Sequence, residues 1–210
     1  QIPGSIATYN AAGAVTGFAG TLTNAGKAKI DGVELEVVAY LTNQLSVSAM
    51  YSHIDAKYKE WMVSNATGTG LINIADSTEF QNTPKNSANV SVNYDWALGL
   101  MGHAGTLSLN NGLAYKSKVY QTEVARATGV PSLDATLPGN LMLAQDGYTL
   151  WDASLVWTSS DRKYQFGLHG RNLTDKRYRV AGYNFSSFFN SVTTFYGDPR
   201  TLRATLDVKF

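Results

Sequence analysis

Apolar and polar side chains alternate at every second residue through much of this 210-residue chain, and no other feature restricts its fold as strongly. In the segment 87–96, apolar side chains from Ala88 to Trp96 alternate with small or polar ones. Because successive side chains of a β-strand point to opposite faces, this period predicts strands with one apolar and one polar face. An all-β, antiparallel chain is predicted, with strands at 29–41, 45–52, 87–96, 107–119, 151–157, 164–169 and 201–210.

The connections between these segments alternate between short turns and long polar stretches. The long stretches cover 60–86, 121–146 and 179–196. Outer-membrane barrels have short turns at one membrane surface and long loops at the other, whereas soluble sandwiches rarely keep this order. Aromatic residues also collect near both ends of the strands, as in the two aromatic girdles of a barrel. We therefore predict a segment of an antiparallel transmembrane β-barrel with about seven strands.

Charge and composition exclude several other classes of protein. The 17 basic and 16 acidic residues leave a net charge of +1, which is too weak to indicate a nucleic-acid partner. No apolar run is long enough for a membrane helix. There is no cysteine, and His53, His103 and His169 lack the spacing of a zinc site, so no metal is expected. No cofactor motif is found either, because Gly68–Gly70 lacks the lysine of a phosphate loop.

Two motifs carry a family resemblance. The run NLTDKRY at 172–178 and the terminal YGDPRTLRATLDVKF at 196–210 resemble the C-terminal signature of TonB-dependent outer-membrane receptors. The segments KIDGVELEV, NTPKNSANVSVNY and GYTLWDASLVW resemble preceding strands of that barrel. The resemblance implies that residues 28–210 form the last strands of a barrel of about 22. Residues 1–27 are expected to be an external loop region or the start of a fragment. The plug and the TonB-contacting segment are not recognised in this sequence.

The resemblance also implies a function and a set of partners. Such receptors bind a scarce nutrient complex, most often a ferric siderophore, and import it without enzymatic activity. The implied partners are outer-membrane lipid, a ferric siderophore or similar small ligand, the TonB complex through parts absent here, and the barrel-assembly machinery. The implied location is the bacterial outer membrane. The final apolar positions resemble the barrel-insertion signal, or belong simply to the aromatic girdle: Leu206, Val208 and Phe210.

Candidate ligand contacts lie in the long stretches, which the barrel prediction places outside the membrane. Aromatic residues crowd into the last stretch and are suited to stack on a planar or apolar ligand, while arginines face its negative charge. The alternative is that these loops pack on one another. The candidates are Arg126, Arg179, Tyr183, Phe185, Phe188, Phe189, Phe195 and Tyr196. The apolar run 137–143 is a candidate lid over the mouth.

The polar face of the strands carries charges of both signs. In a plugged barrel, such residues would contact the plug, and in an open pore they would set weak selectivity. The residues predicted to face the lumen and plug are Glu34, Glu36, Asp95, Asp152, Arg171 and Arg203.

Two alternatives remain open from the sequence. Residues 1–27 would supply an eighth strand in a self-contained outer-membrane barrel with an adhesin or structural role. His169, Ser154 and Asp152 would form the triad of an outer-membrane hydrolase, although no nucleophile-elbow motif accompanies them.

Overall fold

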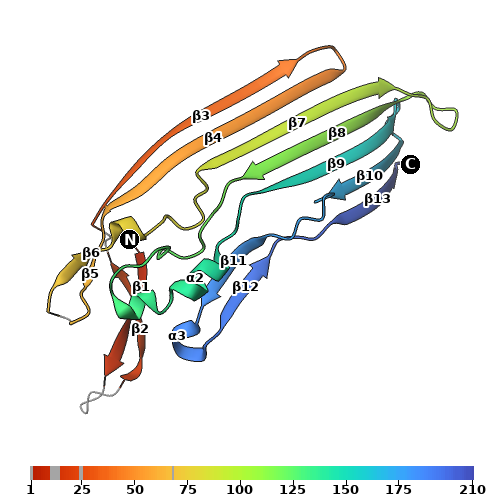
Figure 1. Ribbon diagram of the computed structural model, residues 1–210. Helices are drawn as coiled ribbons and strands as arrows, with labels where there is room; N and C mark the ends of the chain where they lie inside the picture. The colour runs from red at the N-terminus through yellow and green to blue at the C-terminus, as the bar shows by residue number, and fades with distance from the viewer. Residues whose placement is uncertain (1, 10–14, 24–25, 68) are drawn as a thin grey trace.

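Seven antiparallel strands form one continuous sheet, called the wall below. The computed structural model describes residues 2–9, 15–23, 26–67 and 69–210, without the side chains of residues 2–9, 15–23 and Phe188. The strand order is β13-β10-β9-β8-β7-β4-β3, so neighbours in sequence are neighbours in the wall (Figure 1). This confirms the predicted seven-stranded antiparallel segment. Its strands are β3 (Lys27–Tyr40), β4 (Leu45–Glu60), β7 (Asn86–Ala97), β8 (Gly105–Lys116), β9 (Tyr148–Ser159), β10 (Tyr164–Arg171) and β13 (Thr201–Val208).

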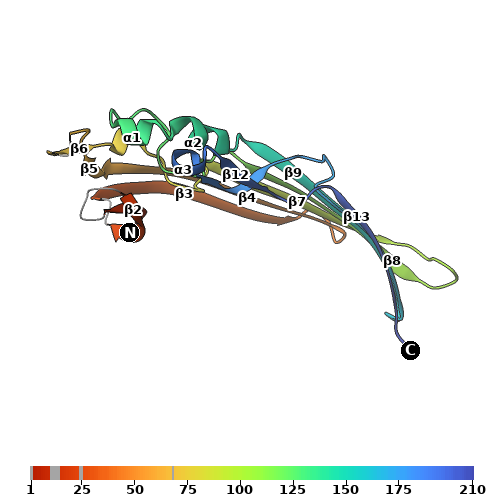
Figure 2. The same cartoon turned by 90° about the horizontal axis from the view of Figure 1, so that it is seen from below.

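The long connections contain more regular structure than the sequence pattern indicates. Hairpins and short helices gather at one end of the wall, whereas the short turns and the C-terminus lie at the other end (Figures 1 and 2). No helix in the described residues has the length and apolar character needed to cross a membrane. The elements are β1 (Ile2–Tyr9), β2 (Val15–Thr23), β5 (Met62–Ser64), β6 (Leu71–Asn73), η1 (Ala75–Ser77), α1 (Pro131–Asp134), α2 (Leu137–Leu143), β11 (Arg179–Asn184), α3 (Ser186–Phe189) and β12 (Val192–Tyr196).

The strand register gives the wall two chemically different faces, because side chains of directly paired residues lie on the same face. On the apolar face, Leu107 pairs with Trp96 and with Trp157. On the polar face, Asn110 pairs with Asn93 and with Ser154. The predicted alternation is therefore realised across neighbouring strands.

Most buried side chains lie among the long connections rather than in the wall. Leu143 is fully buried, and Ile74 and Val130 are 3% and 5% exposed, whereas Leu202 in the wall is 75% exposed. Trp157 is an exception, since it is 3% exposed and its indole Nε1 donates to the Leu98 carbonyl at 2.8 Å. Both faces of the wall are consequently available for contact with other molecules.

The wall remains open at its two edge strands, β3 and β13. The β1–β2 hairpin lies within residues 1–27, and each of its strands pairs with the other rather than with the wall. An eighth strand that closes a small barrel is therefore not formed in the described part of the chain. This finding disfavours the self-contained barrel.

Most predicted strand ends differ from the observed bounds, and two of them were wrong for different reasons. The strand predicted to end at Ser52 continues as β4 to Glu60, because residues 53–60 stay paired with β3 although their side chains are mostly polar or charged. The strand predicted to reach Val119 ends at Lys116, and Val119 instead forms an isolated bridge with Gln145.

Candidate functional site

Three long connections pack together at the end of the wall that carries the helices. We name them loop A (61–85), loop B (117–147) and loop C (172–200), and together they form the loop cluster. Loops A and B pair through their backbones: the Glu79 N–H donates to the Glu123 carbonyl at 2.8 Å, and the Ala125 N–H donates to the Ser77 carbonyl at 3.0 Å. The Arg126 guanidinium donates to the Asp76 carbonyl at 3.0 Å and forms an ion pair with Glu79. These contacts fix loop A against loop B.

Helix α2 of loop B packs against the β11–β12 hairpin of loop C. The Asn184 amide nitrogen donates to the Thr136 carbonyl at 2.8 Å and to Asn140 Oδ1 at 2.7 Å. Glycine permits this approach at two positions, because a Cβ at Gly139 would lie 2.6 Å from Asn184 Oδ1 and one at Gly182 would clash with Leu143. The predicted lid run 137–143 is thus a helix held between loops.

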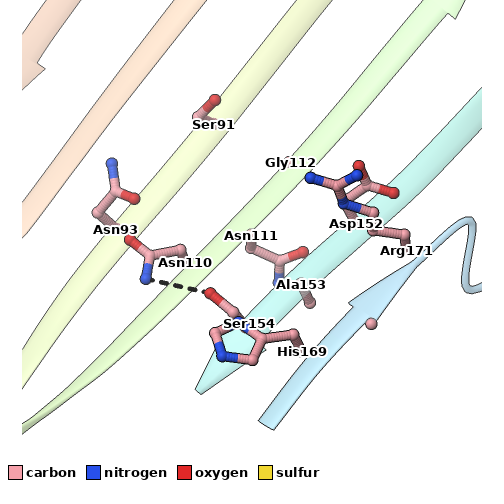
Figure 3. Close-up of a pocket in the computed structure, with 11 residues that line it drawn as sticks. Ser91, Asn93, Asn110, Asn111, Gly112, Asp152, Ala153, Ser154, His169 and Arg171 are labelled. Carbon is pink, nitrogen blue, oxygen red and sulfur yellow. Dashed lines mark hydrogen bonds between the residues drawn. The ribbon is translucent and has the colours of Figure 1, made fainter. Parts of the chain in front are cut away.

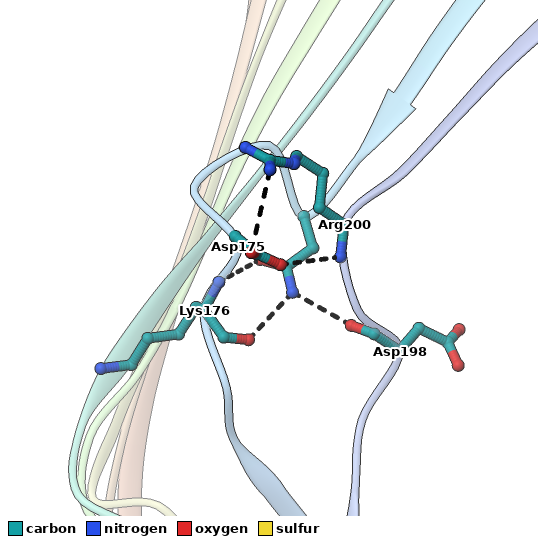
Figure 4. Close-up of polar contacts among 5 residues, drawn as sticks. Asp175, Lys176, Asp198 and Arg200 are labelled. Atoms are coloured by element: carbon teal, nitrogen blue, oxygen red, sulfur yellow. Dashed lines mark hydrogen bonds and ion pairs between the residues drawn. The ribbon is translucent and has the colours of Figure 1, made fainter.

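A clasp of hydrogen bonds joins the two ends of loop C (Figure 4), and one further hydrogen bond ties it to the wall. The backbone N–H of Asn172 donates to Asp152 Oδ1 at 2.8 Å. The side-chain Nδ2 of Asn172 donates to the carbonyls of Lys176 at 2.9 Å and Asp198 at 3.0 Å. Asn172 Oδ1 accepts the Lys176 N–H at 2.8 Å. The Arg200 N–H donates to Asp175 Oδ1 at 3.2 Å. The NLTDKRY and YGDPR motifs therefore build one structural junction at the base of loop C.

Beyond this junction, the β11–β12 hairpin exposes aromatic rings. Tyr183 is 58% exposed and Phe195 is 50% exposed, and their ring centroids are 6.1 Å apart in an edge-on arrangement. Phe185 lies 6.0 Å from Tyr183 and 6.4 Å from Phe189. We call Tyr183, Phe185, Phe189 and Phe195 the aromatic patch. A large exposed apolar group of this kind is typical of a binding surface.

The residues predicted as ligand contacts divide into two groups. Tyr183, Phe185, Phe189 and Phe195 form the aromatic patch, and the Phe188 side chain lies outside the described structure. The other three bind other loop residues. Arg126 joins loops A and B, and Arg179 donates from its N–H to Gln145 Oε1 at 2.8 Å and from its guanidinium to the Ala144 carbonyl at 3.3 Å. The Arg177 guanidinium lies over the Tyr196 ring, with Arg177 Cζ 4.1 Å from the ring centroid.

The residues predicted to face the lumen all lie on the polar face of the wall by register: Glu34, Glu36, Asp95, Asp152, Arg171 and Arg203. Four of its strands, β7, β8, β9 and β10, line a polar recess of about 320 Å³ that includes Asn93, Asp152, His169 and Arg171 (Figure 3). The recess is lined by hydrogen-bonding groups and by both signs of charge.

The geometry of this recess differs from that of a hydrolase triad. Ser154 and His169 are direct cross-strand partners. However, Ser154 accepts a hydrogen bond from Asn110 at 3.3 Å, His169 Nε2 lies 3.3 Å from Thr205 Oγ1, and Asp152 accepts the Asn172 N–H. The three groups therefore serve separate partners. Among the described residues, no group of three or more His, Asp or Glu side chains is placed to hold a metal ion.

One carboxyl group in the loop cluster has a shifted pKa. The Thr128 N–H and hydroxyl donate to Asp134 Oδ1 at 2.6 and 2.7 Å, and the Gly129 N–H donates to Oδ2 at 3.1 Å. These hydrogen bonds, led by that from the Thr128 N–H, lower the pKa of Asp134 because they stabilise its charged form. The ionised carboxylate ties the chain before α1 to its last turn.

The family of the chain follows from a match along nearly its whole length. The family model described as "TonB dependent receptor-like, beta-barrel" matches residues 3–204. The chain belongs to this family. The family consists of outer-membrane transport receptors rather than enzymes, and the fold of this chain matches part of such a β-barrel.

Curated relatives and solved structures agree with this assignment. The chain is 26% identical to the ferrioxamine receptor of Yersinia enterocolitica over 191 residues, covering 89% of this chain and 21% of that protein. It is 26% identical to the probable TonB-dependent siderophore receptor PiuA of Acinetobacter baumannii over 164 residues, covering 78% and 19% of the two chains. The ferric yersiniabactin uptake receptor FyuA of Yersinia pestis shares the fold with a TM-score of 0.61 at 22% identity, covering 90% and 25%. This chain thus spans about a fifth of the length of the curated relatives.

Sequence analysis missed the residues that hold the loop cluster together. Asn140, Gln145 and Asn184 connect loops B and C, and the first two are each 6% exposed. Isolated amides in an irregular stretch carry no periodic signal. The two glycines at the α2–β11 contact, Gly139 and Gly182, were the available hint, since a glycine beside apolar residues often marks a close approach of two segments.

Proposed function

We propose that this chain is the C-terminal wall and external loop cluster of an outer-membrane receptor that imports a ferric siderophore. The aromatic patch carries the proposal, because it is an exposed apolar surface held on a packed base. Loop B braces β11 from the side of Gly182 and Asn184, and the Asn172 clasp fixes both ends of loop C. A binding surface that is ordered before the ligand arrives loses less entropy on binding.

The names of the relatives support the choice of ligand class. The proteins matched in sequence are named as ferrioxamine and siderophore receptors. Aromatic rings can pack on the apolar segments of such a chelate, as they do in other small-molecule sites. In this proposal, the polar face of the wall lines the lumen and contacts the plug, and the parts of the receptor outside this chain contact TonB.

The test uses the full receptor and ferrioxamine B as the first probe. Replacing both Tyr183 and Phe195 by Ala should weaken binding about tenfold or more, since each buried aromatic contact contributes about 1 kcal/mol beyond its area. Tyr40→Ala is the control, because Tyr40 is 82% exposed and lies at the opposite end of the wall. A panel of iron chelates of other classes should follow. Equal affinity in the double variant and the control for every bound chelate would contradict the proposal.

A further inference from the structure

The loop-side extension of β3 and β4 places like charges directly opposite one another. Lys29 pairs with Lys57, and Asp31 pairs with Asp55. Like charges at paired positions destabilise a sheet, whereas Lys opposite Asp at both positions would have been favourable. Each lysine forms its close ion pair along its own strand, with Lys29 Nζ 2.6 Å from Asp31 Oδ2 and Lys57 Nζ 2.7 Å from Asp55 Oδ2.

Because side chains alternate between the two faces along each strand, these four residues lie on the apolar face of the wall, which faces lipid in the proposed barrel. The same face of β4 continues to His53 and Tyr51, and the Tyr51 hydroxyl and His53 Nδ1 both bind Asn86 Oδ1 at 2.8 Å. Tyr51 and Tyr115 are 43% and 41% exposed on this face, as expected for rings at a membrane interface. The sequence of groups leading away from the membrane is therefore aromatic, then histidine, then the aspartate pair, then the lysine pair.

The height of the lysine pair restricts what it can contact. Six residues separate Tyr51 from Lys57, which is about 20 Å along a strand and about 14 Å of height at a tilt near 45°. The headgroup layer of an ordinary bilayer is only about 5–8 Å deep on each side. The lysine side chains are 63% and 58% exposed, so they are accessible from the lipid side.

We infer that Lys29 and Lys57 form a binding surface for the phosphorylated sugar headgroup of an outer-leaflet lipid, a lipopolysaccharide. Two ammonium groups on adjacent strands match a phosphate monoester, and the anion offsets the repulsion between them. Asp31 and Asp55 hold the two lysines in place from the membrane side. The inference rests on the outer-membrane location proposed above.

The experiment measures lipid retained by the purified full receptor, using native mass spectrometry after incubation with diphosphorylated lipopolysaccharide. The double variant K29Q/K57Q should retain about thirtyfold less, since each lysine near an anionic surface contributes about fivefold. The arginine variant K29R/K57R should retain the wild-type amount, because both cations remain. The matched control is K163Q/K209Q, which removes two charges from exposed residues paired at the other end of the wall, where the Lys209 N–H donates to the Lys163 carbonyl at 2.9 Å.

Equal retention by K29Q/K57Q and K163Q/K209Q would overturn the inference. So would undiminished retention of the enzymatically dephosphorylated lipid, or full displacement of the intact lipid by millimolar inorganic phosphate, which would assign the surface to a free anion. Ferrioxamine B binding is measured on the same samples and should be unchanged in all variants. Loss of the siderophore proposal would therefore leave the lipid result standing, and failure of lipid retention would leave the siderophore result standing.

Discussion

Leu168 in the wall leaves 61% of its surface exposed, whereas Leu143 in loop B leaves none. The two leucines belong to one chain and differ in what surrounds them. Leu143 is the last residue of α2 and packs against the β11–β12 hairpin, so its neighbours belong to this chain. Leu168 lies on the apolar face of the wall, and its side chain is shielded from water only when lipid covers that face. The loop cluster is therefore stabilised by internal packing, and the wall by its backbone ladder and its surroundings.

The largest expected difference comes from truncating these two leucines. Leu143→Ala should destabilise the loop cluster by about 3 kcal/mol, because it removes a buried side chain and leaves a cavity. Leu168→Ala should change stability by less than about 1 kcal/mol in a bilayer, since lipid fills the vacated space. Amide hydrogen exchange of β11 and of β10 in the reconstituted receptor measures both effects. Similar losses of protection at the two sites would break the comparison.

The next largest loss of stability should come from breaking the Asn172 clasp, because it joins the wall to the loop cluster. Asn172→Ala removes three side-chain hydrogen bonds and leaves a residue with a φ of 47°, so the base of loop C should lose about 2 kcal/mol. Asn172→Gly tolerates this φ and should lose less, which separates backbone conformation from hydrogen bonding. Limited proteolysis of loop C measures the change. Asn110→Ala, in the polar face of the wall, is the control and should leave loop C resistant to protease.

A smaller effect is expected from Asp134, and it depends on pH. Its folded pKa lies below its ordinary value of 3.8, so the carboxylate stabilises loop B above that pH. This contribution should disappear as the pH falls from about 4 through the folded pKa, because the proton then binds and the hydrogen bonds from Thr128 and Gly129 weaken. Protection of α1 amides against pH is the measurement. Asp134→Asn should remove this pH dependence, and an unchanged profile in that variant would assign it to another group.

The smallest effect should come from an exposed ion pair at the edge of loop B. Lys118 Nζ lies 3.9 Å from Asp146 Oδ1, with 48% and 91% of the two side chains exposed. Lys118→Gln should cost less than about 0.5 kcal/mol because solvent screens such pairs. The unfolding midpoint of the purified receptor in denaturant tests this. A loss as large as that of Asn172→Ala would show that exposed charges, rather than packing, stabilise the loop cluster.

The wall was predictable from sequence because its rule is local. Alternation of apolar and polar residues assigns each side chain to a face, and the register confirms that Ala88, Val92 and Trp96 share the apolar face. This rule was misleading where the side chains of a strand become mostly polar although the strand itself continues. Tyr58, an aromatic residue near the end of its strand, lies on the face opposite to Tyr51 and stacks on Phe80 with ring centroids 4.1 Å apart.

The loop cluster was less predictable because its contacts join residues far apart in the chain. The aromatic crowding in loop C was visible in the sequence, and the exposure of Tyr183 and Phe195 agrees with a surface position. The separate structural contacts of Arg126 and Arg179 were not visible, since they depend on Glu79 and Gln145 in other loops. The family motif around Asn172 was recognised by resemblance alone, and its hydrogen bonds give the physical reason for that motif.

The most direct test of the wall's orientation uses the absence of cysteine from this chain. Single cysteines are introduced along β9 of the full receptor, with any cysteine elsewhere replaced, and are labelled with a fluorophore in vesicles that contain brominated lipid. Labels at Ala153 and Leu155 should be quenched by the lipid, and labels at Asp152 and Ser154 should not. Quenching without this two-residue alternation, or quenching of the polar-face positions, would contradict a wall with lipid on one face and the lumen on the other.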